Sequence, residues 1–378
     1  MITEKGRIWK RYRWIKRQSE KLYYFATFIW WKAQTKASWE DEKAELYKER
    51  PLTAEEKSEV RRVWKNVKVD DKWFVLYNSI RREDPYGFDA RYIPLDLFYC
   101  FIDEWFNHDL EAYALDDKNM YDLYFYDVKR PKTIVRKMNG FMLDENYMPL
   151  TLEQAVKRCK QQKSIIKKPT LYTAGGDGIV FWDEADGEEV LANILEKGGN
   201  YVVQEIVRQH SEMASLHKES VNTIRIITCY FEGEMKILSS LVRIGVGEAR
   251  MDNACAGGVF CGLKEDGSLK KYAYSKRGES FEIHPQGIVY AEHKIPNYDS
   301  CRALTLDLAN RFLRVAKLVS WDLAIGEDGV PVLIEVNLSY GGADIHQIAN
   351  GPLFGEMTER VIDQALNTKK YRRYKGWL

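Results

Sequence analysis

Hydrophobic and polar positions follow the clearest pattern in the segment 321–337. Two apolar runs lie on either side of a Glu-Asp-Gly turn, and this arrangement predicts a β-hairpin. If Gly326 pairs with Pro331 across a four-residue loop, then Asp322 lies opposite Glu335. The hairpin therefore places two carboxylates at one point of a rigid scaffold.

This hairpin also predicts a metal site. Asn337 points to the same face as Glu335 and Asp322, because strand side chains repeat every two residues. Mg²⁺ prefers hard oxygen ligands at about 2.0–2.1 Å and takes its remaining ligands from water and substrate phosphates. The alternative is that both carboxylates are solvated on an open face. Glu335 stands within an apolar run, where its charge needs a partner, so we favour a metal site.

A second segment, 164–182, combines an apolar run, a lysine and several glycines. The run ends near Lys168, and Gly175, Gly176 and Gly178 follow it. Backbone N–H groups of such a loop can turn toward phosphates, and a lysine adds a positive charge. The lysine precedes the glycines, so the segment is not a P-loop. By itself, the loop is equally typical of an ordinary hairpin.

A third segment, 221–244, predicts another hairpin about Gly233. Arg225 and Arg243 interrupt its apolar strands, and an odd-length turn would put both on one face. The planar fork of arginine suits phosphate or carboxylate, and a buried arginine needs such a partner. The alternative for each residue is an ion pair with a nearby acid.

The first 36 residues are basic and aromatic. The basic residues are Lys5, Arg7, Lys10, Arg11, Arg13, Lys16, Arg17, Lys21, Lys32 and Lys36, and the aromatic ones include Trp9, Trp14, Tyr23, Phe25 and Trp30. Such a helix can lie on an anionic membrane surface. We favour the alternative of a solvated helix whose aromatic side chains pack on the rest of the protein. Further helices are expected at 51–68, where Thr53 and Glu56 form a capping box, and at 94–107.

Composition narrows the class of protein. A length of 378 residues suggests two or three domains, and a net charge of +1 argues against general attraction to nucleic acid. The sequence has no apolar stretch of about 20 residues and no signal peptide, so we expect a cytoplasmic location. The six cysteines form no C-x-x-C pair of the kind that binds zinc.

Taken in order, the three segments resemble the ATP-grasp superfamily over residues 115–365. Lys118, within Asp-Lys-Asn, looks like its first phosphate-contacting lysine, and Lys168 looks like the second. The loop 173–178 is similar to the family's flexible lid over the phosphates. The nucleotide-contacting residues that the resemblance implies are Thr173, Ala174, Gly175, Gly176, Gly178, Gln204, Glu205 and Val207, with His210 and Ser211 near the ribose.

The resemblance also implies roles for the remaining site residues. Arg225 and Arg243 would be catalytic and steady the γ-phosphate and an acyl-phosphate, while Asp322, Glu335 and Asn337 would bind the metal. The segment 221–228, the Asp252-Asn253 pair and the Gly257-Gly258 turn look most like the sugar-transfer-associated branch, which is tied to surface-polysaccharide assembly in bacteria. One departure is Ser339-Tyr340-Gly341-Gly342, which replaces the usual Pro-Gly after the metal strand.

The implied fold is the α+β ATP-grasp fold, in which two α+β lobes clasp ATP, with a helical N-terminal extension. The expected parts are 1–60, a basic aromatic helical extension; 61–115, a helical linker region; 116–208, an N-lobe with the glycine-rich phosphate loop; 209–368, a C-lobe with the metal site; and 369–378, a basic tail.

The implied function is ATP-dependent carboxylate–amine ligation through an acyl-phosphate, with ATP and Mg²⁺ or Mn²⁺. The substrate would be a sugar or an amino acid with a carboxylate, used with an amine co-substrate in surface-polysaccharide biosynthesis. A sugar kinase and a non-catalytic nucleotide-binding module are the alternatives. The basic N-terminus is a candidate for contact with the inner face of the membrane or with a glycosyltransferase, and we expect no nucleic-acid partner.

Overall fold

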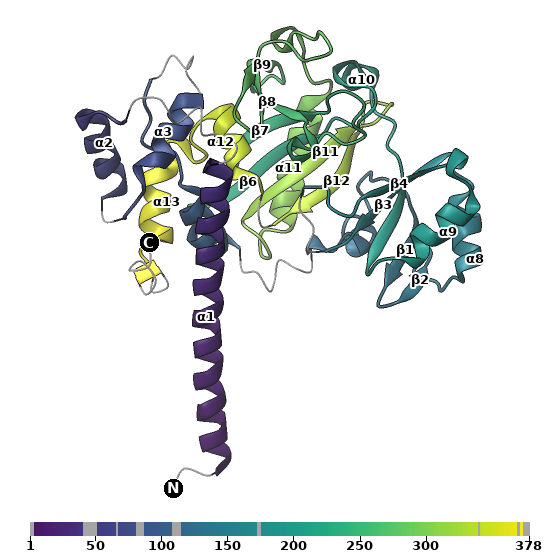
Figure 1. The fold of residues 1–378 in the computed structure, drawn as a ribbon, viewed down its shortest axis with the longest axis horizontal. Helices are drawn as coiled ribbons and strands as arrows, with labels where there is room; N and C mark the ends of the chain where they lie inside the picture. The colour runs from purple at the N-terminus through teal and green to yellow at the C-terminus, as the bar shows by residue number, and fades with distance from the viewer. Residues whose placement is uncertain are drawn as a thin grey trace. The chain divides into compact units, whose positions relative to one another are not determined.

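The computed structural model describes residues 4–40, 51–65, 67–80, 87–107, 115–171, 175–338, 341–368 and 371–372. The chain divides into two units, Met1–Trp105 with Gly351–Leu378, and Phe106–Asn350 (Figure 1). The predicted basic tail 369–378 lies outside the described residues except for 371–372.

The described part of the first unit is helical. Its elements are α1 (Glu4–Glu40), α2 (Ala54–Trp64), α3 (Asp71–Ile80), α4 (Leu95–Leu97), the π-helical turn η2 (Phe98–Ile102), α5 (Asp103–Phe106), η7 (Gly355–Met357) and α13 (Thr358–Ala365). The capping box of Thr53 and Glu56 begins α2 as predicted. The helix expected at 94–107 is present as the consecutive pieces α4, η2 and α5. Our sequence interpretation missed α3.

The aromatic side chains of α1 do not pack as we expected. Trp9, Trp14, Tyr23 and Trp30 are all more exposed than buried. The helix contacts α4 and η2 of its own unit. The prediction that these aromatic residues are covered by the rest of the protein is therefore wrong for the described side chains.

A five-stranded antiparallel sheet opens the second unit. Its order is β2 (Phe141–Leu143), β1 (Thr133–Met138), β5 (Tyr201–Glu205), β3 (Ser164–Pro169) and β4 (Val180–Asp183). One face packs on α8 (Leu152–Cys159) and α9 (Glu188–Glu196) through a core that includes Val135, Trp182 and Leu191. The other face is left for the site, because strand side chains alternate.

A seven-stranded antiparallel sheet forms the rest of this unit. Its order is β10 (Ser280–Phe281), β9 (Leu269–Ser275), β8 (Val259–Leu263), β7 (Glu234–Ile244), β6 (Ile224–Phe231), β11 (Leu318–Ile325) and β12 (Pro331–Asn337). Trp321, Leu323 and Ile226 share a core with α11 (Tyr298–Arg311). The intervening residues Asp322 and Arg225 therefore point to the opposite face.

The hairpin β11–β12 places Asp322 opposite Glu335, as predicted, but by a different register. Ile325, not Gly326, pairs with Pro331, so residues 326–330 rather than 327–330 lie between the last paired positions. A β-bulge then inserts Ile334 as an extra residue on β12, which restores the predicted pairing.

The hairpin β6–β7 shows the same effect. Its turn contains two residues, Glu232 and Gly233, and not the odd number that by itself would put both arginines on one face. A bulge at Leu238 shifts the register, so Arg225 pairs with Leu241. Arg243, two residues beyond Leu241, then shares the face of Arg225.

Candidate active site

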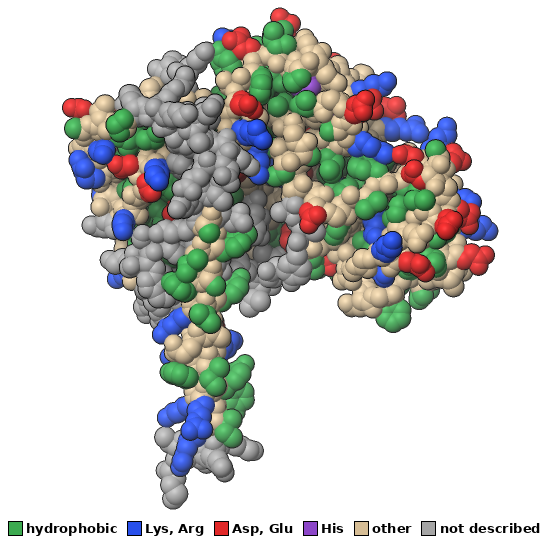
Figure 2. Space-filling view, viewed as in Figure 1, with side chains coloured by type: hydrophobic (Ala, Val, Ile, Leu, Met, Phe, Trp, Pro, Cys, Tyr) green, Lys and Arg blue, Asp and Glu red, His purple; other side chains and the backbone are tan. Residues whose placement is uncertain are grey.

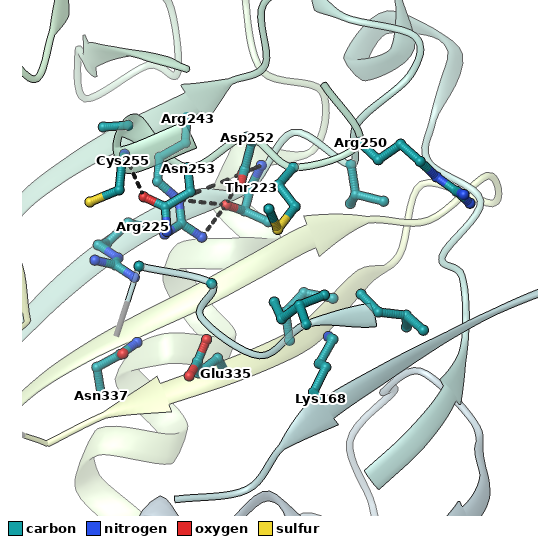
Figure 3. Close-up of a pocket in the computed structure, with 18 of the residues that line it drawn as sticks. Lys168, Thr223, Arg225, Arg243, Arg250, Asp252, Asn253, Cys255, Glu335 and Asn337 are labelled. Carbon is teal, nitrogen blue, oxygen red and sulfur yellow. Dashed lines mark hydrogen bonds and ion pairs between the residues drawn. The ribbon is translucent and has the colours of Figure 1, made fainter. Parts of the chain in front are cut away.

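A cavity of about 590 Å³ in the second unit is lined by residues of both sheets (Figure 3). This volume suits a small-molecule or cofactor site. Its lining includes Lys118, Lys168, Arg225, Arg243, Glu335 and Asn337. The fold thus brings together residues from all three segments that the sequence singled out.

Asp322 lies beneath this cavity and holds both arginines. The Nε and Nη2 atoms of Arg225 donate to its two carboxylate oxygens at 2.6 and 2.7 Å, and Nη2 of Arg243 donates at 3.0 Å. Asp322 is completely buried. Burial would raise its pKa, but the charges of Arg225 and Arg243 outweigh that effect and hold the pKa at about 2. Asp322 is therefore an ionised anchor for two guanidinium groups.

A second acid, Asp252, fixes the other end of this cluster. Its Oδ2 accepts hydrogen bonds from the backbone N–H and the hydroxyl of Thr223. The Thr223 hydroxyl oxygen in turn accepts from Nε and Nη2 of Arg243, at 2.9 and 2.7 Å. Position 258 requires glycine, because a Cβ on Gly258 would lie 2.5 Å from the backbone oxygen of Asp252. Arg243 is thus oriented from two sides.

Glu335 forms an ion pair with Lys118. Nζ of Lys118 lies 2.7 Å from Oε1 of Glu335, and both side chains are largely buried. Lys118 opens a short 3-10 helix, η3 (Lys118–Met120), whose first turn is capped by Asp117. Close by, burial raises the pKa of Asp116 to about 6. The sequence predicted Lys118 and Glu335 as site residues but did not predict that they pair.

Lys168 faces the cavity, whereas its neighbour Lys167 does not. Nζ of Lys167 donates to the carbonyl oxygens of Ile194 and Lys197 at 2.5 and 2.6 Å, on the helical side of the sheet. Nζ of Lys168 forms no hydrogen bond or ion pair with the part of the chain that the structure describes. Burial lowers the pKa of Lys168 to about 8, against the attraction of Glu335. This amine is available to a ligand.

The glycine loop after β3 approaches the loop that follows β7. A Cβ on Gly175 would lie 3.4 Å from Sγ of Cys255, and one on Gly176 would lie 3.1 Å from Sδ of Met251. Gly178 has a φ of +72° and does not line the cavity. A Cβ there would lie 2.8 Å from Cγ of Pro169. Both loops therefore bound the cavity at close range.

Arg250 connects the loop after β7 to the smaller sheet. Its guanidinium donates to Asp183 of β4 at 2.6 and 3.2 Å, and it lies over the ring of Phe181 at 4.2 Å. This contact lies at the boundary of the cavity, since Arg250 and Phe181 both line it. Sequence reasoning missed it because nothing local relates Arg250 to Asp183.

The predicted adenine and ribose segments are only partly in the cavity. Glu205 and Val207 line it together with Ile206, but Gln204 is buried beside Pro131. His210 caps α10 (Ser211–Leu216) by accepting a hydrogen bond from the Glu212 N–H, and Ser211 begins that helix. Neither residue lines the cavity. Thr173 and Ala174, which were also predicted, lie outside the described residues.

The lining includes residues that the sequence did not identify as site residues. Among them are Asp116, Thr223, Arg250, Asp252 and Cys255. The Asp252-Asn253 pair was part of the resemblance to the family, but the hydrogen bonds between Thr223 and Asp252 could not be inferred from the sequence. The loop 339–342, which departs from the family pattern, is described only at Gly341 and Gly342. Gly342 lines the cavity, and a Cβ there would lie 3.1 Å from Nη1 of Arg225.

The predicted metal ligands differ in accessibility. Glu335 and Asn337 line the cavity with oxygen donors that suit Mg²⁺, which is typically held by one or two carboxylates plus substrate phosphates. Both oxygens of Asp322 instead accept from arginines. Among the described residues, no group of three His, Cys, Asp or Glu side chains could hold a metal by itself. The residues present fit a metal that arrives with phosphate ligands.

Comparison with known proteins identifies the family. The family model described as sugar-transfer associated ATP-grasp matches residues 103–362. No curated protein matches the sequence.

Several solved structures are similar to this chain. D-alanyl-alanine synthetase A from Vibrio cholerae O1 biovar eltor is 13% identical with a TM-score of 0.41, and the alignment covers 68% of this chain and 64% of that one. An L-amino acid ligase from Bacillus licheniformis is 14% identical with a TM-score of 0.38, covering 68% and 48%. N5-carboxyaminoimidazole ribonucleotide synthetase from Thermotoga maritima is 9% identical with a TM-score of 0.37, covering 63% and 46%. This chain spans less than two thirds of the length of each.

The family match confirms the resemblance drawn from the order of the motifs. It also confirms the predicted α+β ATP-grasp fold with a helical N-terminal region. The chain belongs to the sugar-transfer associated ATP-grasp family.

Proposed function

We propose that this protein is an ATP-dependent ligase that joins a carboxylate to an amine. The observation that carries the proposal is the cavity in which Lys118, Lys168, Arg225 and Arg243 surround the oxygen donors of Glu335 and Asn337. Phosphoryl transfer requires positioning and charge stabilisation more than covalent catalysis. This set of side chains meets that requirement.

The lysines and arginines have distinct parts in this proposal. Lys168 binds a phosphate oxygen directly, and Lys118 binds one after its ion pair with Glu335 breaks. Arg225 and Arg243, held by Asp322 and Thr223, present fixed guanidinium groups to the γ-phosphate and to the acyl-phosphate. Because these arginines are already oriented, they need little reorganisation during the reaction.

Glu335 and Asn337 would hold Mg²⁺ together with the nucleotide. When bound, the metal supplies positive charge that offsets the charge of the phosphates. Asp322 would join these ligands only by giving up a hydrogen bond to an arginine. Its role in this proposal is therefore to position Arg225 and Arg243.

The reaction proceeds in two balanced steps. An oxygen of the substrate carboxylate bonds to the γ-phosphorus, and the bond to the β–γ bridging oxygen breaks to release ADP. The amine nitrogen then bonds to the acyl carbon, the phosphate leaves, and the nitrogen loses a proton to solvent. We propose a sugar or an amino acid as the acid substrate, and surface-polysaccharide assembly as the setting. The family's sugar-transfer association supports that setting.

ADP release tests the proposal. It is measured with Mg²⁺ and panels of uronic acids, amino acids and amino sugars, each acid with and without an amine. We expect release to require both. Replacing Glu335 by Gln is expected to lower turnover by at least about 100-fold, whereas Glu327→Gln, on the exposed turn of the same hairpin, leaves it unchanged.

Other outcomes would contradict the ligase. A stable phosphorylated sugar formed without amine would identify a kinase. Nucleotide binding without turnover for any pair would identify a binding module. Equal turnover of the Glu335→Gln and Glu327→Gln variants would show that Glu335 has no part in the reaction.

A further inference from the structure

Helix α1 carries an apolar strip along one side, interrupted at Ser19. Successive residues of an α-helix are rotated by about 100°. On that rotation, Ile8, Tyr12, Ile15 and Leu22 lie along one side of α1. These four side chains are 54–68% exposed, although apolar side chains of this size are normally buried. The strip is therefore a candidate interaction surface.

The opposite side of the same helix is basic. Arg7, Lys10, Arg13 and Arg17 are exposed and lie away from the apolar strip on the same rotation. Glu20 is the only acidic residue between Arg7 and Leu22. Figure 2 shows both hydrophobic and basic side chains at the surface of the described part of this helix. Trp14 is an exception, since it lies among the basic residues.

We propose that α1 lies on an anionic lipid surface, with its apolar strip in the boundary between headgroups and acyl chains. A helix with cations on one face and aromatic and aliphatic side chains on the other is suited to that position. Trp9 and Tyr12 contact each other near the strip, and such rings favour the interface because they are apolar with one polar atom. Lys and Arg near an anionic surface each strengthen binding by about fivefold.

The helix would rest on the surface rather than cross it. No described helix is long and apolar enough to span a membrane. In α1 the basic residues recur on every turn of the segment 7–21, and this rules out a continuous apolar cylinder. In an interfacial position, the apolar strip contacts the acyl chains while the basic side contacts the anionic headgroups.

A second copy of this chain fits the strip less well. Ile8, Ile15, Leu22 and Ile29 recur every seven residues, a spacing that is also typical of a coiled coil. With these residues at the a positions of a heptad, the d positions of the seam would be Arg11, Gln18, Phe25 and Lys32, so a dimer would place like charges within its apolar seam. Anionic lipid is complementary to that charge, so charge decides between the two occupants.

Cosedimentation of the full chain with vesicles tests the inference. One set of vesicles contains phosphatidylglycerol and phosphatidylcholine in equal parts, and the other contains phosphatidylcholine alone. We expect binding to the anionic vesicles at least tenfold stronger than to the neutral ones. The variant Ile8→Gln/Ile15→Gln/Leu22→Gln keeps the charge and is expected to bind at least tenfold more weakly.

Two further variants separate charge from apolar contact. Lys10→Gln/Arg13→Gln/Arg17→Gln keeps the strip and is expected to lose most of the preference for anionic vesicles. Glu20→Gln is the matched control for a Gln substitution on the polar side and is expected to bind at least as well as the parent protein. Unchanged thermal unfolding of the second unit shows that each variant is folded.

Three results would overturn the inference. The first is equal binding of the parent protein to both kinds of vesicle, or binding to neither. The second is undiminished binding by the variant that lacks the strip. The third is a dimer in sedimentation velocity that the same variant dissociates, which would assign the strip to a second copy. The inference does not depend on the proposed ligase activity.

Discussion

Replacing Asp322 by Asn is expected to destabilise the second unit strongly. The carboxylate is completely buried and accepts three hydrogen bonds from Arg225 and Arg243, whose side chains are each 11% exposed. An amide removes the ion-pair partner of Arg225 and leaves Arg243 with Asp252, at 3.6 Å, as its remaining carboxylate. It also turns one acceptor atom into a donor that faces a guanidinium.

The expected loss follows from the burial of the pair. Removing one partner of a buried ion pair costs about 3–5 kcal/mol. Asn keeps one oxygen that can still accept from Arg225, so we expect the lower end, about 3 kcal/mol. For a domain of this size, that loss lowers the unfolding midpoint by roughly 6–12 °C.

Asp328→Asn is the matched control, because it makes the same substitution on the turn of the same hairpin. Asp328 pairs with Lys129 at 2.5 Å, but these side chains are 56% and 42% exposed. Water and salt screen such a pair, so little stability is lost with it. Thermal and urea unfolding, followed by circular dichroism, measure both variants. Equal midpoints for the two variants would refute the conclusion that burial makes Asp322 the anchor.

Three further predictions concern single residues. Of the six cysteines, Cys255 is the exposed one, so Ellman's reagent should modify it first in the folded protein. Because Cys255 lines the cavity, Mg²⁺ with ATP should slow that modification. An unchanged rate of modification would count against nucleotide binding in this cavity. Burial lowers the pKa of His284, so the unfolded chain takes up a proton at higher pH than the folded one, and stability should fall as pH drops below about 6.5. Urea midpoints at neutral and mildly acid pH check this, and a His284→Gln variant with the same pH dependence would contradict it. Gly178→Ala should cost at least about 1–2 kcal/mol from its φ of +72° alone, whereas Gly199→Ala, with open space around its Cβ, should unfold near the parent temperature.

The order of the motifs and the alternation within strands were enough to predict much of this protein. They indicated the family, the α+β fold, and hairpins that carry Arg225, Arg243, Asp322 and Glu335 on their inner faces. The capping box at Thr53 likewise fixed the start of α2. These features are local, because a strand or a helix cap is determined by residues a few positions apart.

The exact registers were not predictable in this way. Both hairpins reached the expected pairing through bulges, at Ile334 and Leu238, that compensate for turns of unexpected length. A bulge re-aims the side chains of its strand, and bulges are common next to active sites. The residues of one hairpin do not specify the register in which it pairs with the neighbouring strands of the sheet.

The site shows the same division between local and long-range information. The sequence by itself determined which cations and acids this protein has and how they alternate with apolar residues along its strands. Only the tertiary structure decided that Asp322 holds two arginines, that Lys118 pairs with Glu335, that Arg250 reaches Asp183, and that His210 caps a helix outside the cavity. Each of those contacts depends on packing of segments far apart in the chain, and a charged side chain can satisfy its need for a partner in several ways until that packing selects one.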